Sequence, residues 1–355
     1  MSHYDVIIAG GGFGGLVCAK TLAQAGIRTL LLERKKAPGI GMHTTGIIVG
    51  ECAEEFSLPE HLTRRISRVR LYAPNMKCAE LATDSYFFLA TDTPAVMRHL
   101  SDEALRAGAE ILYDTAYEKG EIAGSGVVVN GQHHARFLIG ADGPRSKVAD
   151  DFALGQNTAF LLGAEAEYTG LPLADDGAFY CFLDQKLARG YLGWVIPSVG
   201  VSQVGIAQRL PRKPEIDAFV GKMKGVFDFS AASVVARRGG LIPVGGLVHP
   251  FATDRVFLLG DSAGIVSPLT AGGIHTAMHY GKRLAEHLAA TLHGHTSNQS
   301  AAEMLQRCYP RFHFKQGLRK SFEHLAPDWL LNQLIGNRLF TIAANHIFFK
   351  KKKLR

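Results

Sequence analysis

Residues 4–15, with the sequence YDVIIAGGGFGG, decide the fold of this chain. The apolar residues at the start of this stretch predict a buried parallel strand, and the small and apolar residues 16–25 predict a helix that ends at Gly26. A second predicted strand, residues 28–32, ends in Glu33. This order of strand, glycine-rich turn, helix, strand and acid is typical of a Rossmann-like unit that binds a dinucleotide.

The glycines of the turn fit the G-x-G-x-x-G pattern, with Gly10, Gly12 and Gly15 at its three positions. The first permits a tight turn, the second lets the backbone approach a pyrophosphate, and the third lets helix and strand pack closely. Glu33 follows Gly15 by 18 positions, near the ~20 expected of the acid that binds an adenosine ribose, and it disfavours the 2′-phosphate of NADP here. The pattern by itself fits both NAD and FAD. The predicted cofactor contacts of this segment are Gly10, Gly12, Phe13, Gly15, Glu33 and Arg34.

The composition is that of an ordinary globular protein. The 355 residues are 47% hydrophobic and 20% charged, and no apolar run reaches the ~18 residues of a spanning helix. Five cysteines are scattered without a C-x-x-C pair, which disfavours a disulfide scaffold or a metal site and favours a reducing, cytoplasmic location. Six charges of the net +7 follow Asp328, so the body of the chain is close to neutral and no nucleic-acid partner is expected.

Two later segments repeat one pattern. Residues 137–143 (FLIGADG) and 256–264 (VFLLGDSAG) each predict an apolar strand that ends in a turn carrying an aspartate, Asp142 or Asp261. In open α/β sheets, ligands bind at the carboxyl edge of the strands, and a carboxylate there suits the hydroxyl groups of a flavin's ribityl chain. Either segment alone would favour a plain turn.

Together the three segments resemble the FAD-dependent para-hydroxybenzoate hydroxylase superfamily, which carries an N-terminal G-x-G-x-x-G, a central D-G and a late G-D followed by a proline and a helix. The resemblance spans residues 1 to about 290 and implies FAD as the cofactor. It implies that Gly260 and Asp261 lie near the flavin ribityl chain, and that Asp142 and Gly143 lie near the pyrophosphate. It also gives Arg98 an FAD contact, although the sequence equally allows a surface arginine on an amphipathic helix.

Within this superfamily the chain is most similar to geranylgeranyl reductases. Residues 260–270 (GDSAGIVSPLT) carry Gly264 where the aromatic hydroxylases usually have a histidine. Residues 190–197 (GYLGWVIP) resemble the Tyr-x-x-Trp-x-x-Pro stretch of the reductases. Flavin halogenases have a second tryptophan where this chain has Leu192, which disfavours a halogenase.

The run after Pro268 predicts the start of a long helix that continues toward Ala289. A helix N-terminus can face the negative charge that reduced flavin carries near N1 and the C2 carbonyl. No second G-x-G-x-x-G follows a strand, so NAD(P)H is expected only as a transient electron donor in a groove, unless another protein supplies the electrons. The expected neighbours of the flavin ring are Pro268, Thr270, Gly272, Gly273 and Ile274.

The candidate catalytic residues lie in three segments. The family places the loop of residues 41–46 (GMHTTG) beside the flavin, so His43 is a candidate proton donor, or it only caps a turn. Thr45, two residues further along the loop, is also a candidate. His275, at the start of the flavin-side helix, has the same two interpretations. Tyr191 and Trp194 are the aromatic residues expected at an apolar pocket, within a group of aromatic side chains that mostly fills the core.

We predict an α/β (α+β) fold in which a Rossmann-like, GR2-type FAD-binding domain is interleaved with a mixed or antiparallel β-sheet substrate domain, followed by C-terminal helices. The FAD-binding domain comprises residues 1–65, 96–158 and 251–295, the substrate domain residues 66–95 and 159–250, and the C-terminal helical region residues 296–355. Strands of the substrate domain are expected at residues 68–72, 86–89, 159–168, 179–183, 191–196 and 201–208.

The C-terminal residues 329–349 are too polar to span a bilayer. They either lie on a membrane as an amphipathic helix, aided by the lysines at 350–353 at ~1 kcal/mol each, or pack on the body of the protein. A lipid substrate would make peripheral membrane contact useful.

The predicted function is hydride transfer from reduced FAD to a carbon–carbon double bond of an isoprenoid or similar apolar substrate. One alternative is an FAD-dependent monooxygenase, related to hydroxylases or halogenases, that acts through a flavin hydroperoxide. The other is a non-catalytic prenyl carrier of related fold. The substrate's identity and the oligomeric state stay open.

Overall fold

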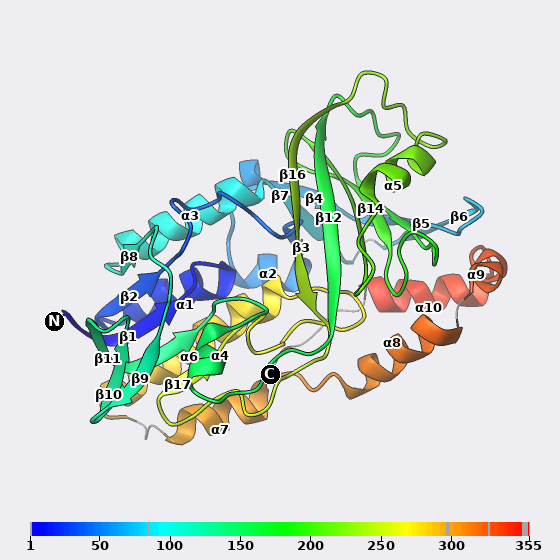
Figure 1. Cartoon of the computed structure of the whole chain (residues 1–355). Helices are drawn as coiled ribbons and strands as arrows, with labels where there is room; N and C mark the ends of the chain where they lie inside the picture. The colour runs from blue at the N-terminus through cyan, green and yellow to red at the C-terminus, as the bar shows by residue number, and fades with distance from the viewer. Residues whose placement is uncertain (1, 84, 296–298, 326, 350–353, 355) are drawn as a thin grey trace.

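The computed structural model describes residues 2–83, 85–295, 299–325, 327–349 and 354. Figure 1 shows two sheet regions side by side, one near the N-terminus and one built around the long upright strands β12 and β16. The chain crosses between these regions several times, because the strands of each sheet come from separate parts of the sequence. The predicted interleaved α/β architecture is therefore confirmed.

The first sheet is the Rossmann-like one. Strands β8, β2, β1 and β11 are parallel neighbours in that order, β17 also pairs in parallel with β11, and β10 and β9 extend the sheet as antiparallel strands. The apolar residues of β2 are all buried, as expected of a parallel strand covered on both faces. The bounds are β1 Ser2–Ala9, β2 Thr29–Leu32, β8 Glu110–Leu112, β9 Gly120–Ala123, β10 Gly126–Val129, β11 His133–Gly140 and β17 Val256–Leu258.

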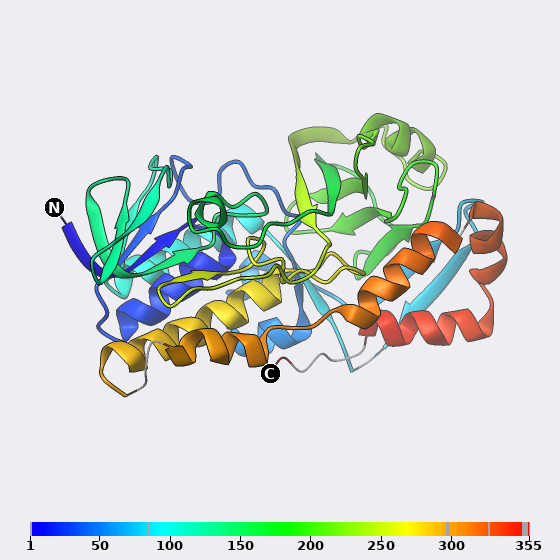
Figure 2. The same ribbon diagram turned by 60° about the horizontal axis from the view of Figure 1, so that its bottom comes forward.

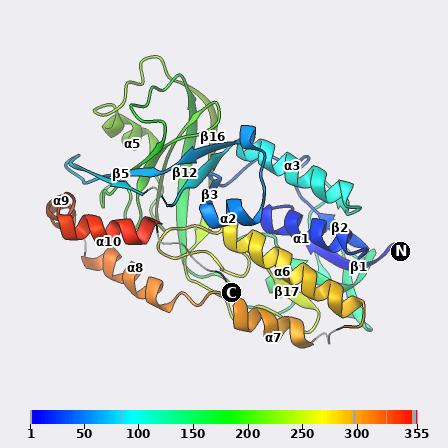
Figure 3. The same ribbon diagram turned by 180° about the vertical axis from the view of Figure 1, so that it is seen from behind.

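Helices α1 (Phe13–Gln24) and α6 (Ile274–Leu292) lie along one another against this sheet, as Figure 3 shows. A Cβ on Gly14 would lie 2.9 Å from the carbonyl oxygen of Ala277, and a Cβ on Gly281 would lie 2.6 Å from that of Gly14. Glycine therefore permits this close helix contact. Both helices were expected, and α1 begins before the predicted residue 16. The other helices beside this sheet are α3 Thr93–Arg106, α4 Lys147–Asp151 and α7 Gln299–Cys308.

The second sheet has the order β16-β12-β15-β14-β13-β5-β6 and is antiparallel except for the β13–β5 pair. Helix α5 (Ile216–Met223) packs on one of its faces. The strand bounds are β5 Arg68–Tyr72, β6 Cys78–Ala82, β12 Phe160–Thr169, β13 Ala178–Phe182, β14 Gly193–Pro197, β15 Ser202–Arg209 and β16 Ser233–Pro243.

A small antiparallel sheet of three strands, in the order β3-β7-β4, completes the β-structure. It is accompanied by helix α2 and a short 3₁₀ segment, both near the start of the chain. The bounds are β3 Ile47–Val49, α2 Gly50–Glu55, η1 Glu60–Leu62, β4 Thr63–Ile66 and β7 Phe88–Thr91.

Three details of the predicted strands were wrong. The strand predicted at 86–89 begins at Phe88 and belongs to the small sheet, and the strand predicted at 191–196 begins at Gly193, which leaves Tyr191 in the preceding turn. The longest strand, β16, was not predicted, because alternating burial is weak in an exposed edge strand that carries a Gly-Gly pair. The domain boundaries given above stay a prediction.

The chain ends in helices α8 (His313–Leu325), α9 (Asp328–Leu334) and α10 (Arg338–Phe349). Figures 1 and 2 show them as a group at the end of the molecule away from the N-terminus. Leu331, Ile335 and Ala344 are buried in the same cluster as Trp194 and Phe179, so α9 and α10 pack on the body of the protein. Within the described residues, no helix is both long and apolar enough to cross a bilayer. The lysines at 350–353 lie outside those residues.

Candidate functional site

The glycine turn forms an open cradle at the start of α1. Gly10 has a positive φ of 109° and its Cβ would collide with the Ala141 carbonyl, whereas a Cβ on Gly12 would meet nothing within 4 Å. Gly12 precedes the first turn of α1, where no described side chain caps the helix and no acid is present. The first N–H groups of α1 can therefore bind an anion that approaches over Gly12.

Glu33 lies at the end of β2, as predicted, and its carboxylate holds the turn in place. It accepts hydrogen bonds from the backbone N–H groups of Gly11 at 2.7 Å and Lys35 at 2.9 Å. The side chain is buried at the carboxyl edge of the sheet, where a ribose would lie. Arg34, next to it, is exposed, and Phe13 is buried in the core below the turn.

The second aspartate turn is built around Asp142. Its carboxylate accepts from Ser146 Oγ at 2.7 Å and from the Val148 N–H at 3.1 Å, so it shapes the turn into α4. Burial raises the pKa of Asp142, and these donors oppose that rise. Gly143 has a φ of 90°, and a Cβ there would meet nothing within 4 Å. A ligand can therefore approach this turn at Gly143, where the space next to the backbone is open.

Burial raises the pKa of Asp261 to about 6. Unlike at Asp142, no hydrogen-bond donor among the described residues opposes this rise. Asp261 follows Gly260, whose φ is 69°. The Asp261 Oδ1 atom lies 3.3 Å from the point where a Cβ on Gly273 would stand. The G-D turn and the start of α6 therefore meet, and the partly buried carboxylate of Asp261 faces that junction. A ribityl hydroxyl is a donor that would stabilise this carboxylate.

The loop before α6 is tied to the substrate sheet. Tyr191 Oη donates to the Thr270 carbonyl at 2.7 Å, and burial raises the pKa of Tyr191. Arg319 on α8 is buried and donates to the carbonyls of Pro268 at 2.7 Å and Gly190 at 2.9 Å. Gly272 is exposed at the tip of this loop, and Ile274 packs partly into the core. Tyr191 and Arg319 thus fix the backbone of the loop that is expected at the flavin ring.

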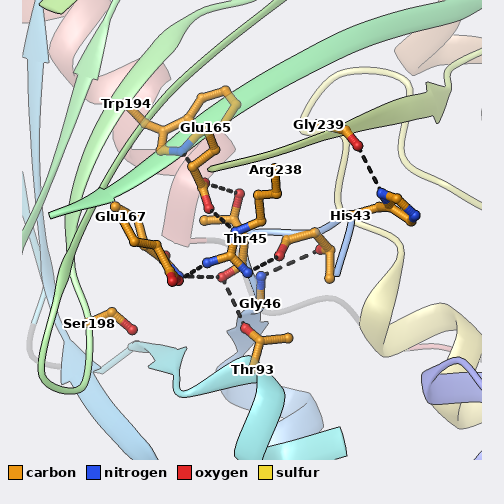
Figure 4. Close-up of polar contacts among 12 residues, drawn as sticks. His43, Thr45, Gly46, Thr93, Glu165, Glu167, Trp194, Ser198, Arg238 and Gly239 are labelled. Carbon is orange, nitrogen blue, oxygen red and sulfur yellow. Dashed lines mark hydrogen bonds and ion pairs between the residues drawn. The ribbon is translucent and has the colours of Figure 1, made fainter. Parts of the chain in front are cut away.

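A buried polar network lies where β12 and β16 face the loop of residues 43–46 (Figure 4). Glu165 Oε2 accepts hydrogen bonds from Thr45 Oγ1 at 2.7 Å and Trp194 Nε1 at 2.8 Å. Arg238 Nε lies 2.8 Å from Glu165 Oε1, and Arg238 also forms an ion pair with Glu167. Burial raises the pKa of Glu165, while the neighbouring cation and donors oppose the rise. The network joins Thr45 and Trp194, two predicted site residues, through one carboxylate.

The same network fixes the backbone of the loop. Arg238 Nη1 donates to the Thr44 carbonyl at 3.2 Å, and Gln203 Nε2 donates to the Thr45 carbonyl at 3.0 Å. His43 Nδ1 lies 2.9 Å from the Gly239 carbonyl, as Figure 4 shows, and the side chain is exposed. Because a carbonyl only accepts, His43 Nδ1 carries the hydrogen of that bond.

Two predicted site residues lie apart from this network. His275 contacts α2, where its Nε2 is 3.6 Å from Glu55 Oε2, and Arg98 is exposed on α3. The roles predicted for His275 and Arg98 stay predictions.

Sequence reasoning missed Glu165, Glu167, Arg238 and Arg319. The two glutamates carried a usable signal, because residues two apart on a predicted strand share one face and acids there interrupt an otherwise apolar pattern. Arg238 lies on the strand that was not predicted, and nothing in the sequence near Arg319 indicates that it reaches two distant carbonyls.

Comparison with known proteins agrees with this geometry. A family model described as "FAD binding domain" matches residues 88–311, and one described as "FAD dependent oxidoreductase" matches residues 5–142. The digeranylgeranylglycerophospholipid reductase of Methanoculleus marisnigri is 30% identical over 315 residues, which cover 80% of this chain and 76% of the relative.

Solved structures share the fold over almost the whole chain. A geranylgeranyl bacteriochlorophyll reductase-like protein from Thermoplasma acidophilum has a TM-score of 0.85 at 18% identity, covering 98% of this chain and 96% of the other. The myxobacterial chondrochloren halogenase has a TM-score of 0.71 at 18% identity, covering 98% and 97%. At these identities the two structures show the fold alone.

Fold, glycine cradle and family matches define an FAD-dependent oxidoreductase. The chain belongs to the para-hydroxybenzoate hydroxylase superfamily, in its geranylgeranyl reductase-like branch, and FAD is its cofactor.

Proposed function

We propose that this flavoprotein reduces carbon–carbon double bonds of an isoprenoid lipid. The bound FAD supplies hydride chemistry. The names of relatives that match most of the chain, digeranylgeranylglycerophospholipid reductases, support the substrate class. The structural observation that carries the proposal is the hydrogen bond from Tyr191 to the Thr270 carbonyl. It joins the aromatic stretch of the substrate sheet to the loop before α6, so an apolar chain along this stretch would lie against the expected flavin ring.

We propose that FAD lies over Gly12 and Gly143, with Glu33 toward the adenosine ribose and Asp261 toward the ribityl chain. The open space at the two glycines supports the phosphate position. The carboxylate of Asp261 beside Gly273 supports the ribityl position, since hydroxyl donors would relieve its burial. The start of α6 then faces the flavin ring, where its N–H groups stabilise negative charge.

We propose His43 as the proton donor and Glu165 as a positioning residue. Because His43 Nδ1 is bound to the Gly239 carbonyl, Nε2 is the atom from which a protonated ring gives up its proton. Glu165 and Arg238 hold the loop that carries His43, and Trp194 shares the same carboxylate. The electron donor is proposed to be NAD(P)H bound transiently.

The test is an anaerobic single-turnover assay with FAD-loaded protein, dithionite or NADPH as reductant, and a phospholipid with geranylgeranyl chains. We expect products that gain two hydrogen atoms per double bond, detected by mass spectrometry. The variant His43→Ala should lower the rate at least about tenfold, while its control, the exposed His61→Ala, should not. FAD absorbance of each variant separates lost cofactor from lost chemistry.

A monooxygenase is the second candidate, because the halogenase shares the fold over nearly the whole chain. Repeating the assay in ¹⁸O₂ distinguishes the two. Labelled oxygen in the lipid would contradict the reductase proposal. The relatives named as reductases favour an enzyme over the prenyl-carrier alternative.

We also propose that α8–α10 dock on a lipid surface. Five large apolar side chains in this described region are exposed, by 38–78%, a concentration not matched by the other exposed apolar residues spread over the rest of the described chain. No acid follows Asp328, and the chain ends with five basic residues among the last six. Exposed apolar side chains, in a sequence that continues into a run of lysines, fit an anionic membrane surface. The five side chains are Phe314, Leu318, Trp329, Leu339 and Ile342.

A further inference from the structure

We propose that Glu55, His275 and His279 form a binding site for a divalent transition-metal ion such as Zn²⁺. In the described part of the chain, this is the group of three ligand-type side chains whose donor atoms all lie within 4.8 Å of one another. The site joins α2 to α6 and lies outside the polar network of the substrate sheet. Its chemistry is separate from the proposed reduction.

The geometry comes from two helices. His275 and His279 are four residues apart on α6, so they lie on one face of that helix. Glu55, the last residue of α2, faces both of them: its Oε2 is 2.9 Å from His279 Nδ1 and 3.6 Å from His275 Nε2. Ligands at ~2.0–2.1 Å from a tetrahedral zinc lie about 3.3 Å apart, a spacing between these two values.

The donor set suits a borderline metal. Two imidazole nitrogens and one carboxylate bind Zn²⁺, Ni²⁺ or Fe²⁺ and leave coordination positions for water. The side chains of Glu55, His275 and His279 are 24%, 11% and 15% exposed, so the site is enclosed but water reaches it.

The local charge favours a cation. Helix α2 carries Glu51 and Glu54 beside Glu55, and both Glu51 and Glu55 act on His275 electrostatically. A neutral imidazole whose hydrogen sits on Nε2 presents a lone pair at Nδ1, which is the atom that His279 turns toward Glu55. Binding thus requires a tautomer change in His279 and no large rearrangement of α2 or α6. We therefore assign His275 to metal binding and not to the proton donation that the sequence suggested for it.

The test is zinc binding by the FAD-loaded full chain, measured by isothermal titration calorimetry after chelator treatment, with bound metal counted by mass spectrometry after desalting. We expect about one equivalent of Zn²⁺ and a rise of the thermal midpoint with added ZnCl₂. Each of His275→Ala, His279→Ala and Glu55→Gln should weaken binding by at least about tenfold.

The matched control is His99→Ala. His99 forms a similar histidine–glutamate pair with Glu103, 3.7 Å apart on α3, but within the described residues it belongs to no group of three ligand-type side chains. It should keep full zinc binding. The proposal is overturned if wild type binds no more zinc than the His275→Ala, His279→Ala double variant, or if His99→Ala loses binding to the same extent. FAD absorbance checks that each variant is folded.

Discussion

Glu165 is the residue on which the polar contacts of the substrate sheet converge. It receives hydrogen bonds from Thr45 and Trp194 and pairs with Arg238, with only 4% of its side chain exposed. A buried charge is stable only when it is paired and hydrogen-bonded. Arg238 depends on Glu165 in the same way, because its own side chain is 9% exposed.

Removing the Glu165 carboxylate leaves the buried charge of Arg238 with Glu167 as its remaining ion-pair partner among the described contacts. We expect Glu165→Ala to lower the free energy of unfolding by about 3–5 kcal/mol, measured by urea denaturation. Glu80→Ala is the control on the same sheet, because Glu80 is 54% exposed and lies 3.6 Å from Arg70. That exposed pair is worth below ~1 kcal/mol, and equal losses in the two variants would contradict the network's importance.

We expect FAD binding to depend on pH through Asp261. Burial raises its pKa to about 6 in the protein without cofactor. Hydroxyl donors of a ribityl chain would stabilise the carboxylate and lower its pKa in the complex, so FAD prefers the ionised form. Affinity is therefore full above pH 6 and falls as the pH drops through that value, by up to about tenfold per pH unit.

Fluorescence titration of FAD between pH 5 and 8 measures this effect. The variant Asp261→Asn cannot ionise and should lose that part of the pH dependence, while Asp142, whose pKa is also raised by burial, stays unchanged in both proteins. A wild-type affinity that is constant across the range would place the ribityl chain elsewhere.

At the scale of elements, the contact between α1 and α6 sets the position of both helix starts. Gly14 and Gly281 leave no room for a side chain at this contact. We expect Gly14→Val to push the helices apart, lower the free energy of unfolding by about 1–3 kcal/mol and weaken FAD binding, because the α1 N-terminus moves from the phosphates.

Gly221 provides the control for the effect of replacing a helical glycine. It lies in α5, is exposed, and a Cβ there would meet nothing within 4 Å. Gly221→Ala should leave FAD binding unchanged and raise the free energy of unfolding by up to ~1 kcal/mol, measured in the same urea titration. Loss of FAD in Gly221→Ala, or none in Gly14→Val, would contradict the argument.

The aromatic side chains of strand β13 point alternately to the two faces of the substrate sheet. Along β13, Phe179 and Cys181 face the cluster shared with Trp194 and α9, whereas Tyr180 and Phe182 face the opposite cluster with α5. The alternation follows from the period of two residues in a strand. Aromatic composition therefore predicted the sheet but not the face that a substrate would meet.

At the scale of the whole molecule, the three C-terminal helices bring both buried and exposed apolar residues to one end. We expect the triple variant Trp329→Ser, Leu339→Ser, Ile342→Ser to bind vesicles containing phosphatidylserine at least about tenfold more weakly than wild type in a sedimentation assay. High salt should weaken wild-type binding, because the cationic tail contributes.

The control for this experiment is Val234→Ser, Val235→Ser on the exposed edge strand β16. That variant also removes exposed apolar side chains but lies on another element, so vesicle binding should stay at the wild-type level. Unchanged binding by the triple variant would show that these helices do not meet the lipid.

Much of the fold is local and could be predicted. The glycine turn at Gly10–Gly15 follows a strand and opens a helix, and those properties depend on neighbours in the sequence. The start of α6 near Gly273 follows for the same reason. A helix start and a strand end fix which groups point toward a ligand, so a dinucleotide site could be predicted before any tertiary contact was known, and the family resemblance implied that the dinucleotide is FAD.

Only the tertiary structure brought Thr45, Glu165 and Arg238 together, and only it placed Glu55 against His275 and His279. These residues lie on elements far apart in the sequence, and their contacts depend on strand register and helix packing. Local periodicity says which face a residue occupies, whereas the partner on the opposing element is chosen by how the whole core closes. The sequence by itself determined the cofactor and the class of chemistry, and the packed molecule decided which side chains surround them.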